Sequence, residues 1–292
     1  MKELLVISGK GGTGKTSITG SLAALAGNKV LVDLDVDAPD LHLLTRPQSS
    51  RQEVFVSGNY AQVRAPDCTG CGHCQEVCAF EAVALEENGS AVIDPMACEG
   101  CKLCVVTCPE EAIDFPEREC GRWMVSDTRF GTMVHAQLYP GQENSGRLVS
   151  LLRQEARQLA EQQGHALILA DGTPGIGCPV ISSLSGTDLA LVVTEPTLSG
   201  VHDLERVLEL CQHFRVPAKV VINKADLNPA MTGQVAEACR RWGVEVVARL
   251  EFDPGFVQAV VAGRTLVEQL PQGRSAGELR SLWSRLETML WS

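Results

Sequence analysis

The fold of this chain follows from one stretch, Ser8-Gly9-Lys10-Gly11-Gly12-Thr13-Gly14-Lys15-Thr16-Ser17. Residues 4–7 before it are apolar, as in a buried strand, and residues 18–25 after it have a helical pattern. Gly9 to Thr16 fits the phosphate-binding loop G-x-x-x-x-G-K-[ST], in which glycines let backbone N–H groups surround phosphate oxygens. We expect Lys15 to reach the β- and γ-phosphates of a nucleotide and the Thr16 hydroxyl to bind Mg²⁺. A glycine turn that binds no ligand is the alternative.

The composition limits the class of protein and its partners. Of 292 residues, 45% are hydrophobic, and no apolar run is long enough to span a bilayer. The N-terminus lacks the basic-then-apolar pattern of a secretion signal, so we expect a cytoplasmic location. A formal net charge of −11 argues against nucleic acid as a partner, because phosphate backbones are bound by clustered Lys and Arg.

The chain contains 12 cysteines, which in the cytoplasm indicate metal or redox chemistry rather than disulfides. Eight of them form two copies of C-x2-C-x2-C-x3-C, offset by thirty positions. This is the spacing of bacterial ferredoxins, in which three cysteines of one copy and the fourth of the other hold each cluster. We therefore assign one [4Fe-4S] cluster to Cys68, Cys71, Cys74 and Cys108, and a second to Cys98, Cys101, Cys104 and Cys78. A zinc module is the alternative, because C-x2-C pairs also bind zinc.

Several further apolar runs indicate strands. Those at residues 30–35 and 166–171 end in carboxylates, at Asp35 and Asp171, and others occupy residues 189–194, 219–222 and 244–247. They alternate with helical patterns, which predicts a doubly wound, mostly parallel α/β sheet. Ligands bind such sheets at the carboxyl ends of the strands, so the two carboxylates are candidate site residues.

A second lysine makes the phosphate loop more specific. The string from Lys10 to Thr16, Lys-Gly-Gly-Thr-Gly-Lys-Thr, resembles the deviant loop of the MinD/ParA/nitrogenase iron protein superfamily. The resemblance implies a P-loop ATPase that binds ATP or ADP through Gly9 to Ser17 and forms a homodimer in its ATP state. It also implies that Lys10 reaches across the dimer to the partner's nucleotide and that Lys10, Lys15 and Asp35 are catalytic.

The same resemblance implies roles for residues after the other strands. Asp35 is expected to orient the attacking water, while Asp37 and Asp171 hold Mg²⁺ together with Thr16. A turn-capping role is the alternative for Asp37 and Asp40. Gly172-Thr173-Pro174-Gly175 looks like the second switch segment, where the Gly175 amide senses the γ-phosphate. The string Asn223-Lys224-Ala225-Asp226 resembles a base-reading loop, so Asn223 and Asp226 are candidate adenine contacts.

The motifs also suggest the domain boundaries. Residues 1–56 and 118–292 are expected to form the ATPase domain, and residues 57–117 an inserted small α+β ferredoxin-like domain. Residues 54–56 and 60–63 are expected to be short strands around a turn at Ser57-Gly58-Asn59. The segment from residue 117 to 142 has no readable pattern.

Two helix starts are predicted from capping residues. Ser145 is expected to cap a helix over residues 146–163, after a polar loop with Glu143 and Asn144 near the ligand edge. Ser275 and Glu278 are expected to form the capping box of a C-terminal helix. The apolar stripe of that helix is expected to pack on the core rather than bind a membrane, because its polar face is not strongly basic.

Together these features suggest an ATPase whose nucleotide state controls electron transfer, through two [4Fe-4S] clusters, to an unidentified redox partner. One alternative is an iron–sulfur cluster carrier, although the four other cysteines form no C-x-x-C pair. Another is a positioning ATPase whose clusters sense redox state. Cys178 lies where the nitrogenase iron protein has a cluster ligand, and Cys120 is the only candidate for a second one. A small buried thiol is the favoured interpretation of Cys178.

Overall fold

The computed structural model describes residues 1–142 and 145–292, so the expected loop residues Glu143 and Asn144 lie outside the described part. The chain divides into two compact units. The first comprises Met1–Glu53, Trp123–Gln137 and Ser145–Ser292. The second comprises Val54–Arg122 and Leu138–Asn144, a wider range than the residues 57–117 expected for an inserted domain.

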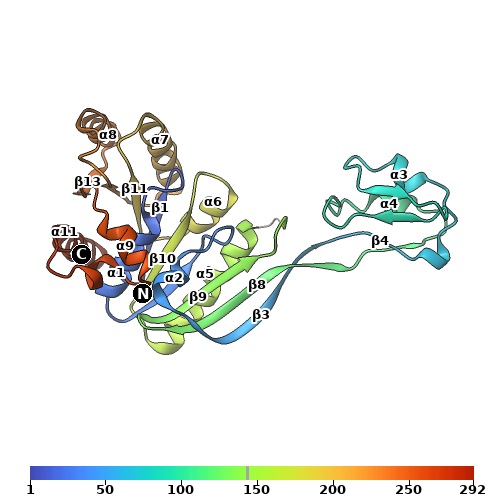
Figure 1. Ribbon diagram of the computed structural model, residues 1–292, viewed down its shortest axis with the longest axis horizontal. Coiled ribbons are helices and arrows are strands. Elements are labelled where there is room, and N and C mark those ends of the chain that lie inside the picture. The colour runs from blue at the N-terminus through green and yellow to red at the C-terminus, as the bar shows by residue number, and fades with distance from the viewer. Residues whose placement is uncertain (143–144) are drawn as a thin grey trace. The chain divides into compact units, whose positions relative to one another are not determined.

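A mostly parallel sheet organises the first unit (Figure 1). Within the described residues, nine strands follow the order β13-β12-β11-β1-β10-β2-β9-β8-β3. The strands from β13 to β9 pair in parallel, as predicted. The bounds are β1 Lys2–Ser8, β2 Lys29–Asp33, β3 Gln48–Asn59, β8 Glu117–Thr128, β9 Gly131–Leu138, β10 Leu167–Pro174, β11 Leu189–Thr194, β12 Ala218–Ile222 and β13 Glu245–Arg249.

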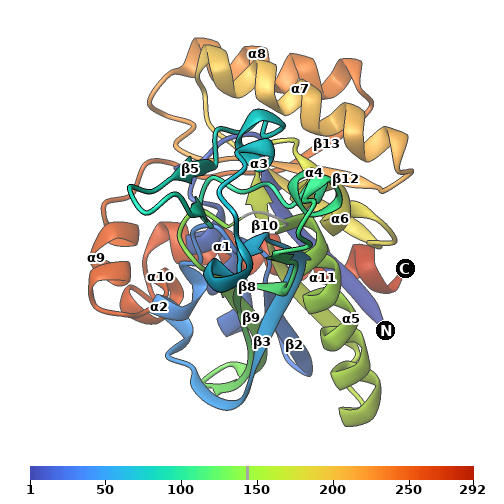
Figure 2. The ribbon, with the colours of Figure 1, turned by 90° about the vertical axis from the view of Figure 1, so that its right-hand side faces the viewer.

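Helices cover this sheet and bury its apolar side chains. Leu4 and Val6 of β1 share one core cluster with Leu22 of α1 and with Leu282 and Leu286 of α11, so the C-terminal helix packs on the core as predicted. Helix α7 packs on β11 and helix α8 on β12 and β13, and the two helices lie side by side (Figure 2). The helix bounds are α1 Lys15–Leu25, α2 Leu41–Thr45, α5 Ser145–Gln163, α6 Cys178–Leu184, α7 Leu198–His213, α8 Pro229–Arg241, α9 Gly255–Val261, α10 Leu266–Gln269 and α11 Arg274–Trp291.

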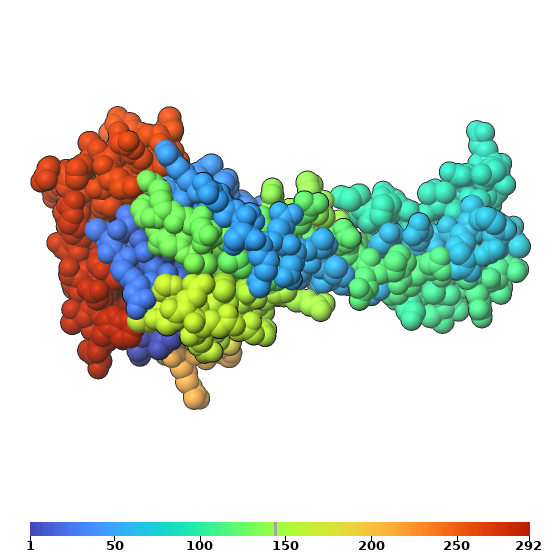
Figure 3. Space-filling view, turned by 90° about the horizontal axis from the view of Figure 1, so that it is seen from below, coloured from blue at the N-terminus to red at the C-terminus, as the bar shows by residue number. Residues whose placement is uncertain are grey.

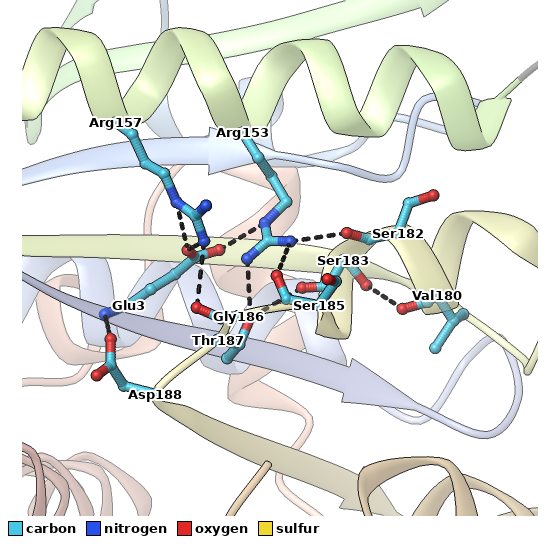
Figure 4. Close-up of polar contacts among 10 residues, drawn as sticks. All are labelled: Glu3, Arg153, Arg157, Val180, Ser182, Ser183, Ser185, Gly186, Thr187 and Asp188. Atoms are coloured by element: carbon cyan, nitrogen blue, oxygen red, sulfur yellow. Dashed lines mark hydrogen bonds and ion pairs between the residues drawn. The ribbon is translucent and has the colours of Figure 1, made fainter. Parts of the chain in front are cut away.

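A buried ion cluster joins the start of β1 to two helices (Figure 4). The Glu3 carboxylate accepts hydrogen bonds from Arg153 Nε at 2.7 Å and from Arg157 Nη2 at 2.7 Å. Arg153 also donates to the carbonyls of Ser182 and Ser185, each at 2.7 Å. Because Glu3 and Arg153 are both buried, this cluster fixes α5 against β1 and against the C-terminal end of α6.

The second unit is built from short elements, coloured from blue through cyan to green in Figure 3. Two antiparallel pairs, β4 with β7 and β5 with β6, accompany two short helices. Its small core cluster contains cysteines as well as apolar side chains. The bounds are β4 Gln62–Val63, η1 Ala65–Asp67, α3 His73–Glu76, β5 Val83–Leu85, β6 Ala91–Ile93, α4 Leu103–Thr107 and β7 Ile113–Asp114.

Two local predictions are corrected by the structure, which also shows the strands of one segment that had no predicted structure. The turn predicted at residues 57–59 is wrong, because β3 runs unbroken from Gln48 to Asn59 beside β8, and sheet pairing outweighs the turn propensity of these residues. The segment from residue 117 forms β8 and β9, which are joined by a turn at residues 129–130. The capping box predicted at Ser275 is also wrong. Its hydroxyl donates to Asp253 Oδ2, and Gly273 precedes the helix.

Two other helix starts can be compared with the sequence. A capping box is present at α10, where the Thr265 side chain and Glu268 cap each other's backbone. Helix α5 begins at Ser145 itself, one residue earlier than the predicted range. Among the described residues, no helix has both the length and the apolar character needed to cross a membrane.

Candidate functional site

The phosphate loop joins β1 to α1 with a backbone that needs its glycines. Gly12 and Gly14 adopt φ of +77° and +90°, which L side chains rarely adopt. A Cβ at Gly14 would also lie 2.5 Å from Asn223 Nδ2, and one at Gly9 would lie 2.5 Å from Asp203 Cβ. The close approach of these two neighbours explains why glycine occupies both positions.

Lys15 lies among the carboxylates that were expected to bind Mg²⁺ and position water. Its Nζ is 2.9 Å from Asp171 Oδ1 and 3.6 Å from Asp35 Oδ2. Burial alone would lower the pKa of Lys15. The negative charges of Asp171 and Asp35 raise this pKa by more than burial lowers it, so it lies above the usual value. Thr16 donates to Asp171 Oδ2 at 2.7 Å and Thr19 donates to Asp171 Oδ1 at 2.8 Å. The predicted catalytic lysine, Mg²⁺ ligands and water-orienting carboxylate are thus adjacent.

A cavity of about 770 Å³ opens on this group. Its lining includes the loop from Gly11 to Ser17, the carboxylates Asp35, Asp37 and Asp40, and Ser145. Burial raises the pKa of Asp35 to about 6 and also raises that of Asp37. The cavity therefore has phosphate-binding amides on one side and carboxylates on the other, as a Mg²⁺–nucleotide site requires.

A second cavity of about 340 Å³ shares Gly12, Gly14 and Ser17 with the first. Its remaining walls come from the loops after β12 and β13 and from α9. They consist of Asn223, Lys224, Phe252, Asp253, Phe256, Val257, Val260 and Val261. Apolar walls next to a phosphate loop suit a flat base.

The loop after β12 is tied to the phosphate loop by hydrogen bonds. The Asn223 amide donates to the Thr13 carbonyl at 2.8 Å, and Lys224 Nζ donates to the Gly12 carbonyl at 3.0 Å. Asp226 Oδ1 accepts from the Phe252 N–H at 2.5 Å. Asn223 and Asp226 are thus engaged in shaping this cavity, and a contact with adenine remains a prediction.

Lys10 is bound within its own chain. Its Nζ forms an ion pair with Glu195 Oε1 at 2.7 Å and donates to the hydroxyls of Thr197 and Ser199, each at 3.1 Å. Lys224 contacts the other oxygen of Glu195 at 2.9 Å. Burial alone would raise the pKa of Glu195, but hydrogen bonds from Lys10 and Lys224 hold it below its usual range. No local pattern in the sequence indicates this anchor, because Glu195 lies far along the chain.

The expected γ-phosphate sensor lies next to the end of β1. The Gly175 N–H donates to the Ser8 carbonyl at 2.8 Å, and Gly175 has φ of +95°. Cys178, three residues later, is exposed at the start of α6, so its interpretation as a buried thiol is wrong. Cys120 is buried, and its thiol donates to the Ser57 carbonyl at 3.2 Å.

Two hydroxyls of this site are buried without a partner in the described part of the chain: that of Thr173 was missed by sequence reasoning, whereas Thr13 lies within the predicted loop from Gly9 to Ser17. Thr13 Oγ1 and Thr173 Oγ1 have no hydrogen-bond partner among the described residues. Both threonines line the larger cavity, and an unpaired buried hydroxyl costs free energy. They are therefore candidates for contacts with a nucleotide or with the water around Mg²⁺.

The second unit contains two smaller cavities, and each is lined by four cysteines. Each has a volume of about 20 Å³. The cysteines around the first cavity are Cys68, Cys71, Cys74 and Cys108. Those around the second are Cys78, Cys98, Cys101 and Cys104. These are the two groups that the sequence spacing assigned to the two clusters.

The backbone of this unit brings donors toward the thiols. N–H groups of Ala91 and Gly70 lower the pKa of Cys68, and the Ala112 N–H donates to Cys108 Sγ at 3.4 Å. Gly70 was missed as a site residue. A Cβ there would lie 2.1 Å from the Gly89 carbonyl, so the loop around Cys68 requires glycine. Within the described residues, no three His, Cys, Asp or Glu side chains form a site for a single metal ion.

Comparison with known proteins agrees with this geometry. The family model of the CobQ/CobB/MinD/ParA nucleotide binding domain matches residues 4–266. The chain belongs to this family. An uncharacterized protein of Methanocaldococcus jannaschii is 35% identical over 229 residues, which cover 77% of this chain and 79% of that protein. The chain is thus an ATPase of the MinD/ParA type, with a P-loop NTPase fold.

Two further likenesses concern the fold and the cysteine-rich unit. The cell division ATPase MinD of Pyrococcus furiosus superposes with a TM-score of 0.58 at 16% identity, with 99% of each chain covered. A 60-residue match at 37% identity joins 20% of this chain to 18% of one component of the Na⁺-translocating ferredoxin:NAD⁺ oxidoreductase complex of Acetobacterium woodii. The first likeness supports the fold, and the second is too short to define a function.

Proposed function

We propose that this protein is a dimeric iron–sulfur ATPase that uses its nucleotide state to control electron transfer through two [4Fe-4S] clusters. The observation that carries the proposal is the presence, in one chain, of a nucleotide site and of two cavities with four cysteines each. Mg²⁺ and ATP or ADP would occupy the first site. A separate redox protein would exchange electrons with the clusters.

The cysteine cavities fit the proposed clusters. A [4Fe-4S] cubane is bound by four cysteine thiolates, and four cysteines line each cavity. When bound, the clusters would supply one-electron carriers. The backbone N–H groups near Cys68 and Cys108 would stabilise the charge on the bound sulfurs. The partial match to a component of a ferredoxin:NAD⁺ oxidoreductase supports the same interpretation.

The nucleotide site would work by exchanging one set of charge contacts for another. Lys15 now contacts Asp171 and Asp35, and ATP phosphates would take their place at its Nζ. Thr16, Asp37 and Asp171 would then be available for Mg²⁺ and its water. Asp35 would accept a hydrogen bond from the attacking water, as the family resemblance implies.

Dimerisation would require Lys10 to leave its anchor. Its ammonium now contacts Glu195, Thr197 and Ser199 of its own chain. The γ-phosphates of a partner's nucleotide carry more negative charge than the Glu195 carboxylate and would draw Lys10 away. The competition between Glu195 and ATP would thus set the threshold for forming the dimer.

Arg129 would connect the nucleotide site to the strands that continue into the second unit. It lies in the turn between β8 and β9, both of which extend past the boundary of the first unit. Its Nε donates to the Leu44 carbonyl at 2.9 Å, on the helix that follows Asp35 and Asp37. Its other nitrogens contact Glu268 at 2.5 and 2.8 Å and the Gly263 carbonyl at 3.3 Å, just after α9. Movement of α2, or of the segment from α9 to α10, would therefore also move this turn.

The proposal is tested first by chemical analysis. Anaerobic protein reconstituted with iron and sulfide should hold about eight of each per chain. Cys78→Ser and Cys101→Ser should alter the same EPR signal after reduction, and Cys71→Ser the other signal. Stoichiometric zinc, or retention of both signals in all three variants, would contradict the proposal.

Coupling is tested separately by comparing nucleotide states. The cluster potentials should differ between ADP and a non-hydrolysable ATP analogue. Arg129→Met should abolish the difference while leaving ATP binding intact. Arg274→Met is a matched control, because Arg274 forms exposed ion pairs with Glu251 and Glu278. Equal potentials in both nucleotide states of the wild type would refute coupling.

A further inference from the structure

The second unit is an internal repeat, and its two halves have matching backbones. Gly70 and Gly100 adopt φ of +69° and +66°, and Glu81 and Glu111 adopt +53° and +49°. Gly72 and Lys102, thirty positions apart, precede α3 and α4 with φ of +80° and +67°. The two cavities therefore lie at equivalent ends of the repeat, and residues thirty positions apart can be compared directly.

The surfaces of these two ends differ in chemistry. At the second cavity, three large apolar residues are exposed beside the charged Glu99 and Lys102: Phe80, Leu103 and Val106, with exposed fractions of 45%, 46% and 74%. Phe80 and Leu103 line this cavity directly, and Val106 is one helical turn after Leu103. At the first cavity, the equivalent positions hold exposed polar residues: Glu110, His73 and Glu76. We call Phe80, Leu103 and Val106 the apolar end, and Glu110, His73 and Glu76 the polar end.

Exposed apolar side chains cost solubility, and clusters of them mark sites of interaction. Here the duplicated half supplies an internal comparison, because the same backbone carries polar residues at the other end. The fold of the repeat therefore does not require Phe80, Leu103 and Val106 to be apolar. A role in contact with another protein explains them.

The charge around the apolar end indicates what kind of protein. The whole chain has a net charge of −11. Residues 54–122 contain twelve Asp and Glu but only four Lys and Arg, so much of this negative charge lies in the second unit. All four cations have partners within the unit: Arg64 with Asp67 and Asp114, Arg118 with the Cys98 carbonyl, Arg122 with Tyr139, and Lys102 with the Phe115 ring. At this surface a partner with a basic face would be attracted, whereas the same acidic surface of a second copy would be repelled.

We propose that the apolar end is the docking surface for a redox protein that presents an apolar centre within a basic rim. This proposal rests on the proposed function, because it takes the second cavity as a cluster site. One electron would pass from the reduced cluster bound by Cys78, Cys98, Cys101 and Cys104 to the partner's oxidised centre. The cluster would return to its oxidised state, and the polar end would not contact this partner.

The experiment exchanges the surfaces of the two ends. Leu103→His with Val106→Glu gives the apolar end the residues of the polar end. The reciprocal control, His73→Leu with Glu76→Val, does the opposite at the first cavity. Each new side chain already occurs at the equivalent repeat position, which favours correct folding. Val106→Glu alone is a further variant, because Val106 is the most exposed of the three.

The probe is mitochondrial ferricytochrome c, a basic electron carrier with an exposed haem edge. Dithionite-reduced holoprotein is mixed with it under anaerobic conditions, and the second-order rate constant is measured at several salt concentrations. Binding of the oxidised holoprotein to cytochrome c is measured in parallel by calorimetry, which requires no electron transfer. Iron and sulfide are counted for every variant.

We expect the Leu103→His/Val106→Glu variant to lose about tenfold in both rate and affinity at high salt, where the added carboxylate, which would attract a basic partner at low salt, is screened. Val106→Glu should lose part of this, and the reciprocal variant should stay within about twofold of wild type. High salt should slow the wild-type reaction. Equal losses at both ends, or none at the apolar end, would overturn the docking proposal alone. Absence of iron and sulfide from the wild type would overturn the proposed function as well.

Discussion

The buried ion cluster at the start of β1 makes a quantitative prediction about stability. Glu3 has a side-chain exposure of 4% and Arg153 of 7%, so both charges are desolvated. Glu3→Gln removes one charge and leaves the Arg153 guanidinium buried without a carboxylate. Removing one partner of a buried pair costs about 3–5 kcal/mol, so we expect a loss near the lower limit because Arg157 is partly exposed.

The adjacent residue provides a matched control. Lys2 and Asp188 form an ion pair at 3.3 Å, with side-chain exposures of 41% and 37%. Such exposed pairs contribute about 0–1 kcal/mol, so Lys2→Met should have a small effect. Replacing both charges, as Glu3→Leu with Arg153→Met, should cost less than the sum of the single substitutions, because no unpaired charge remains buried.

Urea unfolding of the holoprotein, followed by far-UV circular dichroism, measures these differences. All the residues involved lie in the first unit, which contains most of the helix that this signal reports. A Glu3→Gln effect no larger than that of Lys2→Met would refute the reasoning, as would strictly additive losses in the double variant.

Three other predictions concern single side chains. Burial raises the pKa of Asp35 to about 6, so kcat/KM for ATP should rise with pH through about 6 as the carboxylate ionises, and Asp35→Asn should abolish this rise. Burial lowers the pKa of Lys29 from 10.5 to about 8. Between pH 8 and pH 10.5, the unfolded chain therefore binds more protons at Lys29 than the folded chain does. The wild type should therefore gain urea stability relative to Lys29→Met over that pH range, and parallel pH curves would contradict this. Glu195→Gln should weaken the anchor on Lys10 and increase ATP-dependent dimerisation, measured by light scattering; an unchanged dimer fraction would exclude Glu195 as the anchor.

The parts of the fold that were predictable depend on local sequence. The phosphate loop requires glycines at fixed positions, and the central strands are short apolar runs that stay apolar because both faces are covered. The cysteine groups were also predictable, because their spacing determines which thiols meet. Cys78 and Cys108 line opposite cavities, as the spacing requires.

The parts that were not predictable depend on contacts distant in sequence. The residues of β8 and β9 are mixed polar and apolar, and only their place beside β2 and β3 makes them strands. The anchor of Lys10 at Glu195 and the contacts of Arg129 join residues more than eighty positions apart. Ser275 and Glu278 have the pattern of a capping box, but Asp253 binds the Ser275 hydroxyl instead.

The exchange of cysteines between the two halves has a consequence for how the second unit matures. Neither half supplies four thiols to one cavity, so neither half can retain iron alone. The core cluster of this unit is small, and the bound inorganic centres would act as staples between the halves, much as structural metals do in other small domains. Oxygen that destroys one centre would then loosen both halves. In this protein, oxidative damage would cause a loss of folding as well as a loss of electron transfer.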